Sequence, residues 1–219
     1  MWCIQRIDEE YRSRMYRLLD LYKAPYDPSM PVICMDEKSK QLLGDIRKPI
    51  PAKPGSIQKY DYEYKRKGTC NIFVAVEPKS GIRFCEVTDT RTKADFAYFV
   101  WELVEIQFSD AQCIQIVLDN LNTHFEGSLI ETFGKQQAAR LMKRIKFIYT
   151  PKHASWLNMA EIEINIMDRQ CTGGRIEDKA KLATEVKRWS ENRNNKKCKI
   201  EWKFTRQDAD QKLSKHYVA

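Results

Sequence analysis

Residues 113–119 carry the sequence CIQIVLD, a short and mostly apolar run that ends at Asp119. Both faces of the run carry apolar side chains, a pattern typical of a central strand that helices cover on each side. A second short run, VICM at residues 32–35, ends in the same way at Asp36. Ligands of open α/β sheets gather at the carboxyl ends of strands, so both acids stand where a site would form. A lone aspartate after a strand is more often a turn residue or a helix cap, and two of them weaken that alternative without excluding it.

The segments on either side of these runs predict a mixture of strands and helices. Residues 71–76 and 82–88 are separated by a PKSG turn and predict a β-hairpin. A Thr-x-x-Asp pattern at Thr92 predicts a helix start. Further helices are predicted at 8–22, 126–142, 156–168 and 177–192, and a further strand at 145–149. This order indicates an α/β fold with a central sheet flanked by helices on both faces.

Composition narrows the class of protein. The 219 residues are 42% hydrophobic, which is enough for a packed core and argues against wholesale disorder. The net charge of +8 favours a polyanionic partner such as nucleic acid, although a moderately basic enzyme without such a partner explains it equally well. The seven cysteines form no Cys-x-x-Cys pair and are interpreted as buried apolar residues of a reducing compartment. With no signal peptide and no membrane-spanning run, a cytoplasmic protein is expected.

The third acid comes from the segment SWLNMAEIE at residues 155–163. In a helix capped at Ser155, Glu161 and Glu163 point about 200° apart, so only one of them can face a given site. Periodicity does not choose between them, and the alternative is that both are solvated helix charges. Three clustered carboxylates suit magnesium, which prefers oxygen ligands, and can hold two ions roughly 3.5–4 Å apart around a scissile phosphate.

Three segments together resemble a known family: VICMDEK at 32–38, LDNLNTH at 118–124 and TPKHASWLNMAE at 150–161. They resemble bacterial insertion-sequence transposases of the mariner superfamily, which are DDE enzymes, and the resemblance runs from residues 2–4 to residues 201–205. It implies a ribonuclease H-like fold with a central mixed five-stranded sheet flanked by helices. It also implies that Asp36, Asp119 and Glu161 are the catalytic residues and hold two Mg2+ (or Mn2+) ions. The implied reaction is cut-and-paste transposition, in which water cleaves DNA at the element ends and the freed 3′-hydroxyl attacks target DNA.

Several further residues are expected to contact DNA. Aromatic and cationic residues are interleaved in residues 38–67, and cations are dense in residues 175–199, which suits phosphate contact and stacking, although charge runs are usually solvated surface. Asn120 and Asn158 are expected to hydrogen-bond metal-bound waters or DNA, although asparagine after a strand is also ordinary turn chemistry. His124 and His153 are expected to contact the scissile phosphate or to orient a carboxylate, although a loop histidine can simply cap a helix. Trp156 is open between core packing and base stacking. The expected DNA contacts are Asn120, His124, Lys152, His153, Asn158, Lys65, Arg66 and Lys67.

The resemblance also predicts an organisation of the chain. We expect a linker helix at 1–30, the ribonuclease H-like DDE catalytic domain at 31–194 and a basic C-terminal extension at 195–219. Relatives carry an N-terminal helix-turn-helix region that finds the element ends, and it is expected to be missing here. A homodimer on DNA, associated with the bacterial nucleoid, is expected. The alternatives are a nuclease of the same fold that does not transpose, a catalytically inactive or regulatory DNA-binding remnant, and a plain structural α/β protein.

Overall fold

A single five-stranded mixed sheet organises the chain in the computed structural model, which describes residues 6–218. Its strand order is β3-β2-β1-β4-β5. β1 pairs antiparallel with β2 and β2 with β3, whereas β1, β4 and β5 run parallel. The strands are β1 (Val32–Asp45), β2 (Tyr64–Glu77), β3 (Ile82–Thr88), β4 (Ile114–Leu118) and β5 (Ile145–Tyr149). The predicted fold class, a mixed five-stranded sheet flanked by helices, is thereby confirmed. Residues 2–4, where the family resemblance begins, lie outside the described residues.

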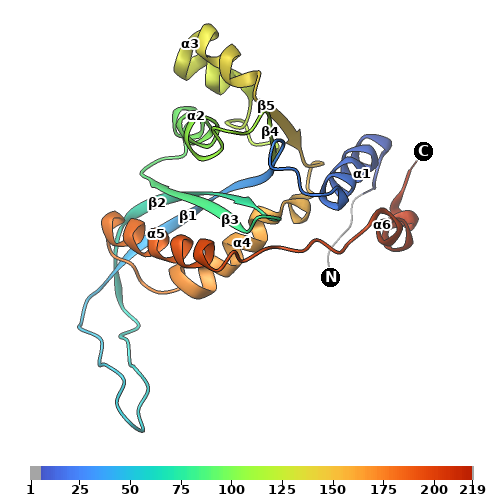
Figure 1. The fold of residues 1–219 in the computed structure, drawn as a ribbon. Coiled ribbons are helices and arrows are strands. Elements are labelled where there is room, and N and C mark those ends of the chain that lie inside the picture. The colour runs from blue at the N-terminus through green and yellow to red at the C-terminus, as the bar shows by residue number, and fades with distance from the viewer. Residues whose placement is uncertain (1–5, 219) are drawn as a thin grey trace.

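Helices cover both faces of this sheet (Figure 1). α2 and α3 pack on one face, and α4 and α5 pack on the other. α1 and the C-terminal α6 lie beside each other at the end of the sheet nearest α4. The helices are α1 (Glu9–Lys23), α2 (Lys93–Glu102), α3 (Glu126–Met142), α4 (Met159–Met167), α5 (Lys179–Asn195) and α6 (Arg206–Leu213), and π-helical turns follow α2 at Leu103–Gln107 and α4 at Asp168–Thr172.

The alternation of side chains along the strands explains the two layers. In β4, Ile114, Ile116 and Leu118 enter the core beneath α2 and α3, whereas Val117 faces the opposite side. The five residues of β4 are mostly buried on both faces, as the apolar run predicts for a central strand. In the residues that the structure describes, no helix is long and apolar enough to cross a membrane.

Local signals located some elements well and others poorly. Thr92 caps α2 with a complete capping box to Asp95, as predicted. The predicted start of a helix at Ser155 is wrong, because residues 155–157 form a 3-10 turn and α4 begins after Asn158. The reason is a cap: the side-chain oxygen of Asn158 accepts a hydrogen bond from the amide of Ala160.

The segment predicted as a long basic loop is partly strand. β1 and β2 continue beyond a register shift between Leu42 and Leu43 and carry a long connection away from the body. We call residues 43–67 the arm; Figure 1 shows it projecting far below the sheet. The strands were longer than predicted because the arm has exposed side chains on both faces and so lacks the apolar alternation that identifies a strand.

Candidate catalytic site

Asp119 directly follows β4, as predicted, but Asp36 lies within β1 and not after it, because β1 continues to Asp45 along its antiparallel partner β2. The last paired residues of β1 and β4 are Cys34 and Val117. Asp36 and Asp119 each lie two residues further along, so the register places them opposite one another. Because side chains alternate along a strand, Asp36 lies on the same face as Cys34, which is the face that α4 covers.

The environment of Asp36 is both buried and negatively charged. Burial raises the pKa of Asp36 to about 7, and the negative charges of Asp119, Glu37 and Glu161 add to the rise. The backbone N–H of Glu37 donates to Oδ1 of Asp36 at 2.8 Å and opposes this shift in the pKa. The structure therefore brings Asp36, Asp119 and Glu161 near enough for their charges to interact.

α4 holds Glu161 in its first turn, and a buried asparagine sets the position of that turn. Nδ2 of Asn158 donates to the carbonyl of Met35 at 2.8 Å, while its Oδ1 caps α4. The start of α4 is thereby tied to β1 one residue before Asp36. Asn158 has no exposed surface, so the expectation that it contacts DNA is wrong.

The neighbouring glutamate of α4 has a different partner. The carboxylate of Glu163 is fully buried and lies 2.7 Å from Nε of Arg83 and 2.8 Å from Nε of Arg193. These cations come from β3 and α5, on the side of α4 away from Asp36. Glu161 is only partly buried, and its charge reaches Asp36.

A histidine and a glutamate support Asp119. Nδ1 of His124 lies 2.7 Å from Oδ1 of Asp119, and Nε2 of His124 lies 2.9 Å from Oε2 of Glu37. Burial lowers the pKa of His124, but its contacts with Asp119 and Glu37 raise it to about 9. For Asp119, burial raises the pKa, but the contact with His124 and the hydrogen bond from the amide of Leu121 outweigh burial and hold the pKa below its usual value.

His124 is 1% exposed, so the expectation that it contacts DNA directly is also wrong. Glu37 is the site residue that sequence reasoning missed. The available signal was its place directly after Asp36 within the quoted segment VICMDEK.

The remaining predicted contacts are at the surface. Lys152 and His153 are exposed on the turn after β5, and His153 has a φ of 58°. Asn120 donates from Nδ2 to the carbonyl of Thr150 at 2.8 Å and accepts from Nη1 of Arg14 at 3.2 Å. These residues surround the edge of the sheet that carries the acids.

Trp156 is partly packed and partly exposed. Its ring stacks on Trp202 with centroids 6.5 Å apart and meets Phe204 edge-on, yet 41% of the residue is exposed. It thus belongs to a surface aromatic cluster shared with the C-terminal segment.

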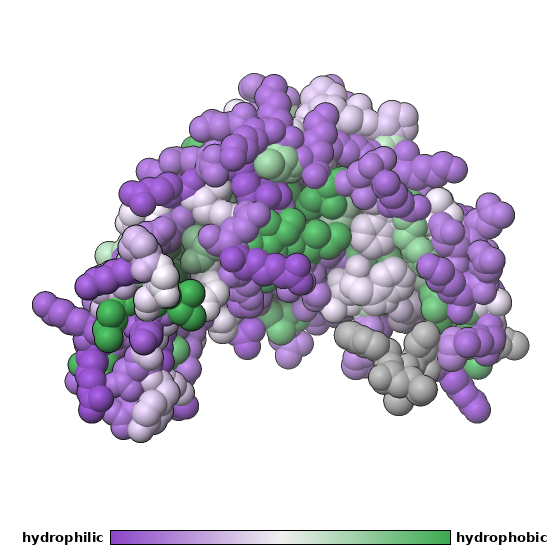
Figure 2. Space-filling view, turned by 90° about the horizontal axis from the view of Figure 1, so that it is seen from below, coloured by the Kyte–Doolittle hydropathy of each residue, from purple (hydrophilic) through white to green (hydrophobic). Residues whose placement is uncertain are grey.

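The three cations of the arm lie apart from the acids. Lys65, Arg66 and Lys67 are exposed and sit at the base of the arm, with Arg66 paired to Leu43. Leu43 lies seven positions after Asp36, which is roughly 23 Å along β1. The arm is mostly hydrophilic, with isolated hydrophobic residues on its surface (Figure 2, lower left).

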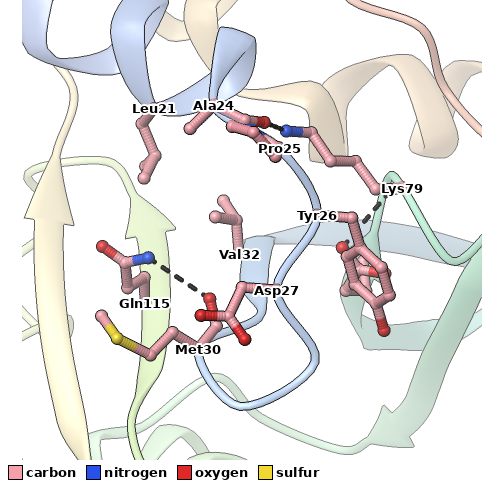
Figure 3. A pocket seen from close by; sticks show the side chains of 10 residues that line it. Leu21, Ala24, Pro25, Tyr26, Asp27, Met30, Val32, Lys79 and Gln115 are labelled. Atoms are coloured by element: carbon pink, nitrogen blue, oxygen red, sulfur yellow. Dashed lines mark hydrogen bonds between the residues drawn. The ribbon is translucent and has the colours of Figure 1, made fainter.

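A pocket of about 350 Å³ lies elsewhere (Figure 3). Leu21 and Tyr26 line it together with Val32 and Gln115, which stand at the amino ends of β1 and β4. Asp36 and Asp119 lie beyond the other end of the parallel pairing between these strands, so this pocket is no part of their site.

Comparison with known proteins agrees with this geometry. The model of the DDE superfamily endonuclease family matches residues 31–183. A comparison with curated protein sequences finds no relative.

Solved structures share the fold. The crystal structure of the Mos1 mariner paired-end complex with Mn has a TM-score of 0.59 at 13% identity, covering 90% of this chain and 60% of that one. The corresponding complex with Mg has a TM-score of 0.58 at 15% identity, covering 100% and 66%. The Mos1 strand transfer complex has a TM-score of 0.54 at 15% identity, covering 88% and 55%. The chain thus spans 55% to 66% of the length of these structures.

The family match extends from β1 through all five strands and beyond α4, so it includes every element that carries one of the three acids. On this ground, the chain belongs to the DDE superfamily endonucleases.

Proposed function

We propose that the chain is the catalytic part of a transposase that cleaves DNA strands and joins the freed 3′-hydroxyl to target DNA. The observation that carries this proposal is the environment of Asp36, whose pKa is raised to about 7 by burial and by the charges of Asp119, Glu37 and Glu161. A buried group of acids just beyond the end of the parallel β1–β4 pairing is costly for the fold and is typical of a functional site.

The donor set suits two Mg2+ or Mn2+ ions held by Asp36, Asp119 and Glu161. Carboxylate oxygens are the ligands that these cations prefer, and positive charge would relieve the repulsion that raises the pKa of Asp36. Among residues 6–218, no three His, Cys, Asp or Glu side chains already converge on a metal position. Anions without a cation between them repel, and Asp119 is turned toward His124. When bound, the ions would activate the attacking oxygen and stabilise the leaving one.

The chain's own residues would perform the remaining tasks. Lys152 and His153, exposed beside the acids, would contact the phosphates of the strand that is cut. Asn120, tied to Arg14, would bring a cation from α1 to the same edge. The arm cations Lys65, Arg66 and Lys67 would contact the DNA backbone further along.

The proposed partners are the element ends and target DNA, with two copies of the chain acting on paired ends in the cytoplasm at the nucleoid. The similar solved structures include a paired-end complex and a strand transfer complex of Mos1, which supports this choice of partner. The domain limits, with a linker helix at 1–30, the catalytic domain at 31–194 and a basic extension at 195–219, are part of the same proposal.

A strand-transfer assay tests the function. Pre-cut oligonucleotides carrying the terminal repeats that flank the coding sequence are incubated with plasmid target in Mg2+ or Mn2+. We expect joined products with the wild-type chain and none with Asp119→Ala. Joining that survives Asp119→Ala would contradict the mechanism. DNA binding without cleavage or joining in either metal would instead support an inactive or regulatory remnant.

A further inference from the structure

We infer that Glu37 and His124 are a positioning pair that holds the carboxylate of Asp119 in the orientation a divalent cation needs. This inference rests on the proposed function, because it assigns the pair a role toward the ions of the same site. Neither residue would touch DNA. Both would act through Asp119.

The side chain of His124 contacts Asp119 on one side of its ring and Glu37 on the other. Oδ1 of Asp119 lies 2.7 Å from Nδ1 of His124, and Nε2 of the same ring lies 2.9 Å from Oε2 of Glu37. The amide of Leu121 also donates to Oδ1 of Asp119 at 3.0 Å. One carboxylate oxygen therefore has two fixed partners, which leaves the second oxygen free for a cation.

The histidine ring itself cannot turn easily. Its plane packs against Phe96 with centroids 4.9 Å apart, and the hydroxyl of Tyr149 donates to the His124 carbonyl at 2.9 Å. The side chain of His124 has no exposed surface, and that of Glu37 has 3%. Ligands of metal sites are commonly oriented by such partners outside the coordination sphere.

A purely structural role explains this arrangement poorly. Apolar side chains of similar volume fill a core at least as well as a buried ion pair. Both carboxylate oxygens of Glu37 are buried and make no well-aligned hydrogen bond. Among residues 6–218, the one other cation within ion-pair distance is Nη1 of Arg91, 3.9 Å from Oε1. Glu37 is thus buried with His124 as its close partner, which fits selection for the orientation of that ring.

The pair also connects the two strands that carry the acids. Glu37 follows Asp36 on β1, and its amide donates to Oδ1 of Asp36 at 2.8 Å. The same residue therefore contacts one acid through its backbone and reaches the other, on β4, through His124. The relative placement of Asp36 and Asp119 would depend on it.

Mn2+ binding by isothermal titration calorimetry, without DNA, tests the inference. In a variant that replaces His124 with asparagine, the amide nitrogen would lie near the position of Nδ1. In one that replaces it with glutamine, the amide nitrogen would lie near the position of Nε2. His124→Asn should keep the contact with Asp119 and bind Mn2+ within about threefold of wild type. His124→Gln should lose it and bind about 10- to 100-fold more weakly, the range typical for such partners. Glu37→Gln, which can still accept from the ring, should bind better than Glu37→Leu.

Controls separate positioning from stability. Val186→Ala, in the α5 core far from the acids, should lower the melting temperature without changing Mn2+ affinity. If wild type binds Mn2+ no better than Asp119→Ala does, the proposed metal site itself fails. If wild type binds Mn2+ and both His124→Gln and Glu37→Leu bind it equally well, the metal site stands and the positioning role is overturned.

Discussion

The carboxylate of Glu163 lies 2.7 Å from Nε of Arg83, and neither side chain has any exposed surface. Arg83 also donates to the carbonyl of Cys198 at 2.6 Å and to the side chain of Asn194 at 3.1 Å. The pair therefore joins α4 to β3, to the end of α5 and to the segment that follows it. This contact gives α4 its rotation about its own axis, which leaves Glu161 on the side of the acids.

Breaking this pair should destabilise the fold strongly. Glu163→Gln leaves the buried guanidinium of Arg83 without its anion, so the free energy of unfolding should fall by about 3–5 kcal/mol. Urea denaturation followed by circular dichroism measures it. The double variant Glu163→Leu with Arg83→Met removes both fully buried charges and should recover part of the loss, because Arg193 still lacks its anion. A loss below about 1 kcal/mol in the single variant would contradict the structural role of the Glu163–Arg83 pair.

Asp36 should lower stability at high pH when no metal is present. Its pKa is about 7 in the fold against an ordinary value of 3.8, so between these values the folded chain holds a proton that the unfolded chain has lost. The contribution of Asp36 to the free energy of unfolding therefore falls as pH rises from about 4 to about 7. The resulting loss of stability remains at higher pH. In EDTA at pH 8, Asp36→Asn should raise the melting temperature by several degrees, and the difference should shrink toward pH 4. An equal melting temperature at pH 8 would contradict the buried, repelled state of Asp36.

The side chain of Asn158 should contribute in two separable ways. Asn158→Ala removes the cap of α4 and the bond to Met35, and should cost about 1–3 kcal/mol. Asn158→Asp keeps a capping oxygen but replaces the donor to the Met35 carbonyl with a buried carboxylate oxygen, so it disrupts the tie to β1 while the cap is retained. Thermal unfolding of both variants checks this. If Asn158→Asp is as stable as wild type, the tie to β1 contributes nothing.

The arm cations should supply affinity for DNA without sequence preference. Replacing Lys65, Arg66 and Lys67 with alanine should weaken binding and reduce the slope of log affinity against log salt by up to about three, roughly one for each lost phosphate contact. Fluorescence anisotropy with unrelated duplexes at several salt concentrations measures both. The matched control removes three charges, at Lys135 and Arg140 in α3 and at Lys143, which caps its C-terminus, and should leave the slope unchanged. Equal slopes for the arm variant and wild type would exclude the arm from the DNA interface.

The sequence by itself determined the elements whose burial is local and periodic. The apolar run ending at Leu118 and the capping box at Thr92 predict β4 and the start of α2, because strand burial and helix capping depend on neighbours within a few residues. The acids Asp36 and Asp119 were found for the same reason, since each follows such a run. The extent of the arm was missed because its exposed strands carry no apolar alternation to detect.

Only the tertiary structure decided which polar residues face the site and which are enclosed. The periodicity of a helix shows that Glu161 and Glu163 point in different directions, but it does not show which of them faces the site. Glu163 is enclosed because it binds Arg83, which lies 80 positions earlier in the sequence. His124 and Asn158 were expected at the DNA surface from their motifs, and both are buried because Glu37 and Met35 on β1 supply their partners. The burial of a charged or polar side chain depends on a partner that compensates its lost hydration, and here those partners are far away in sequence and meet only when the strands pair.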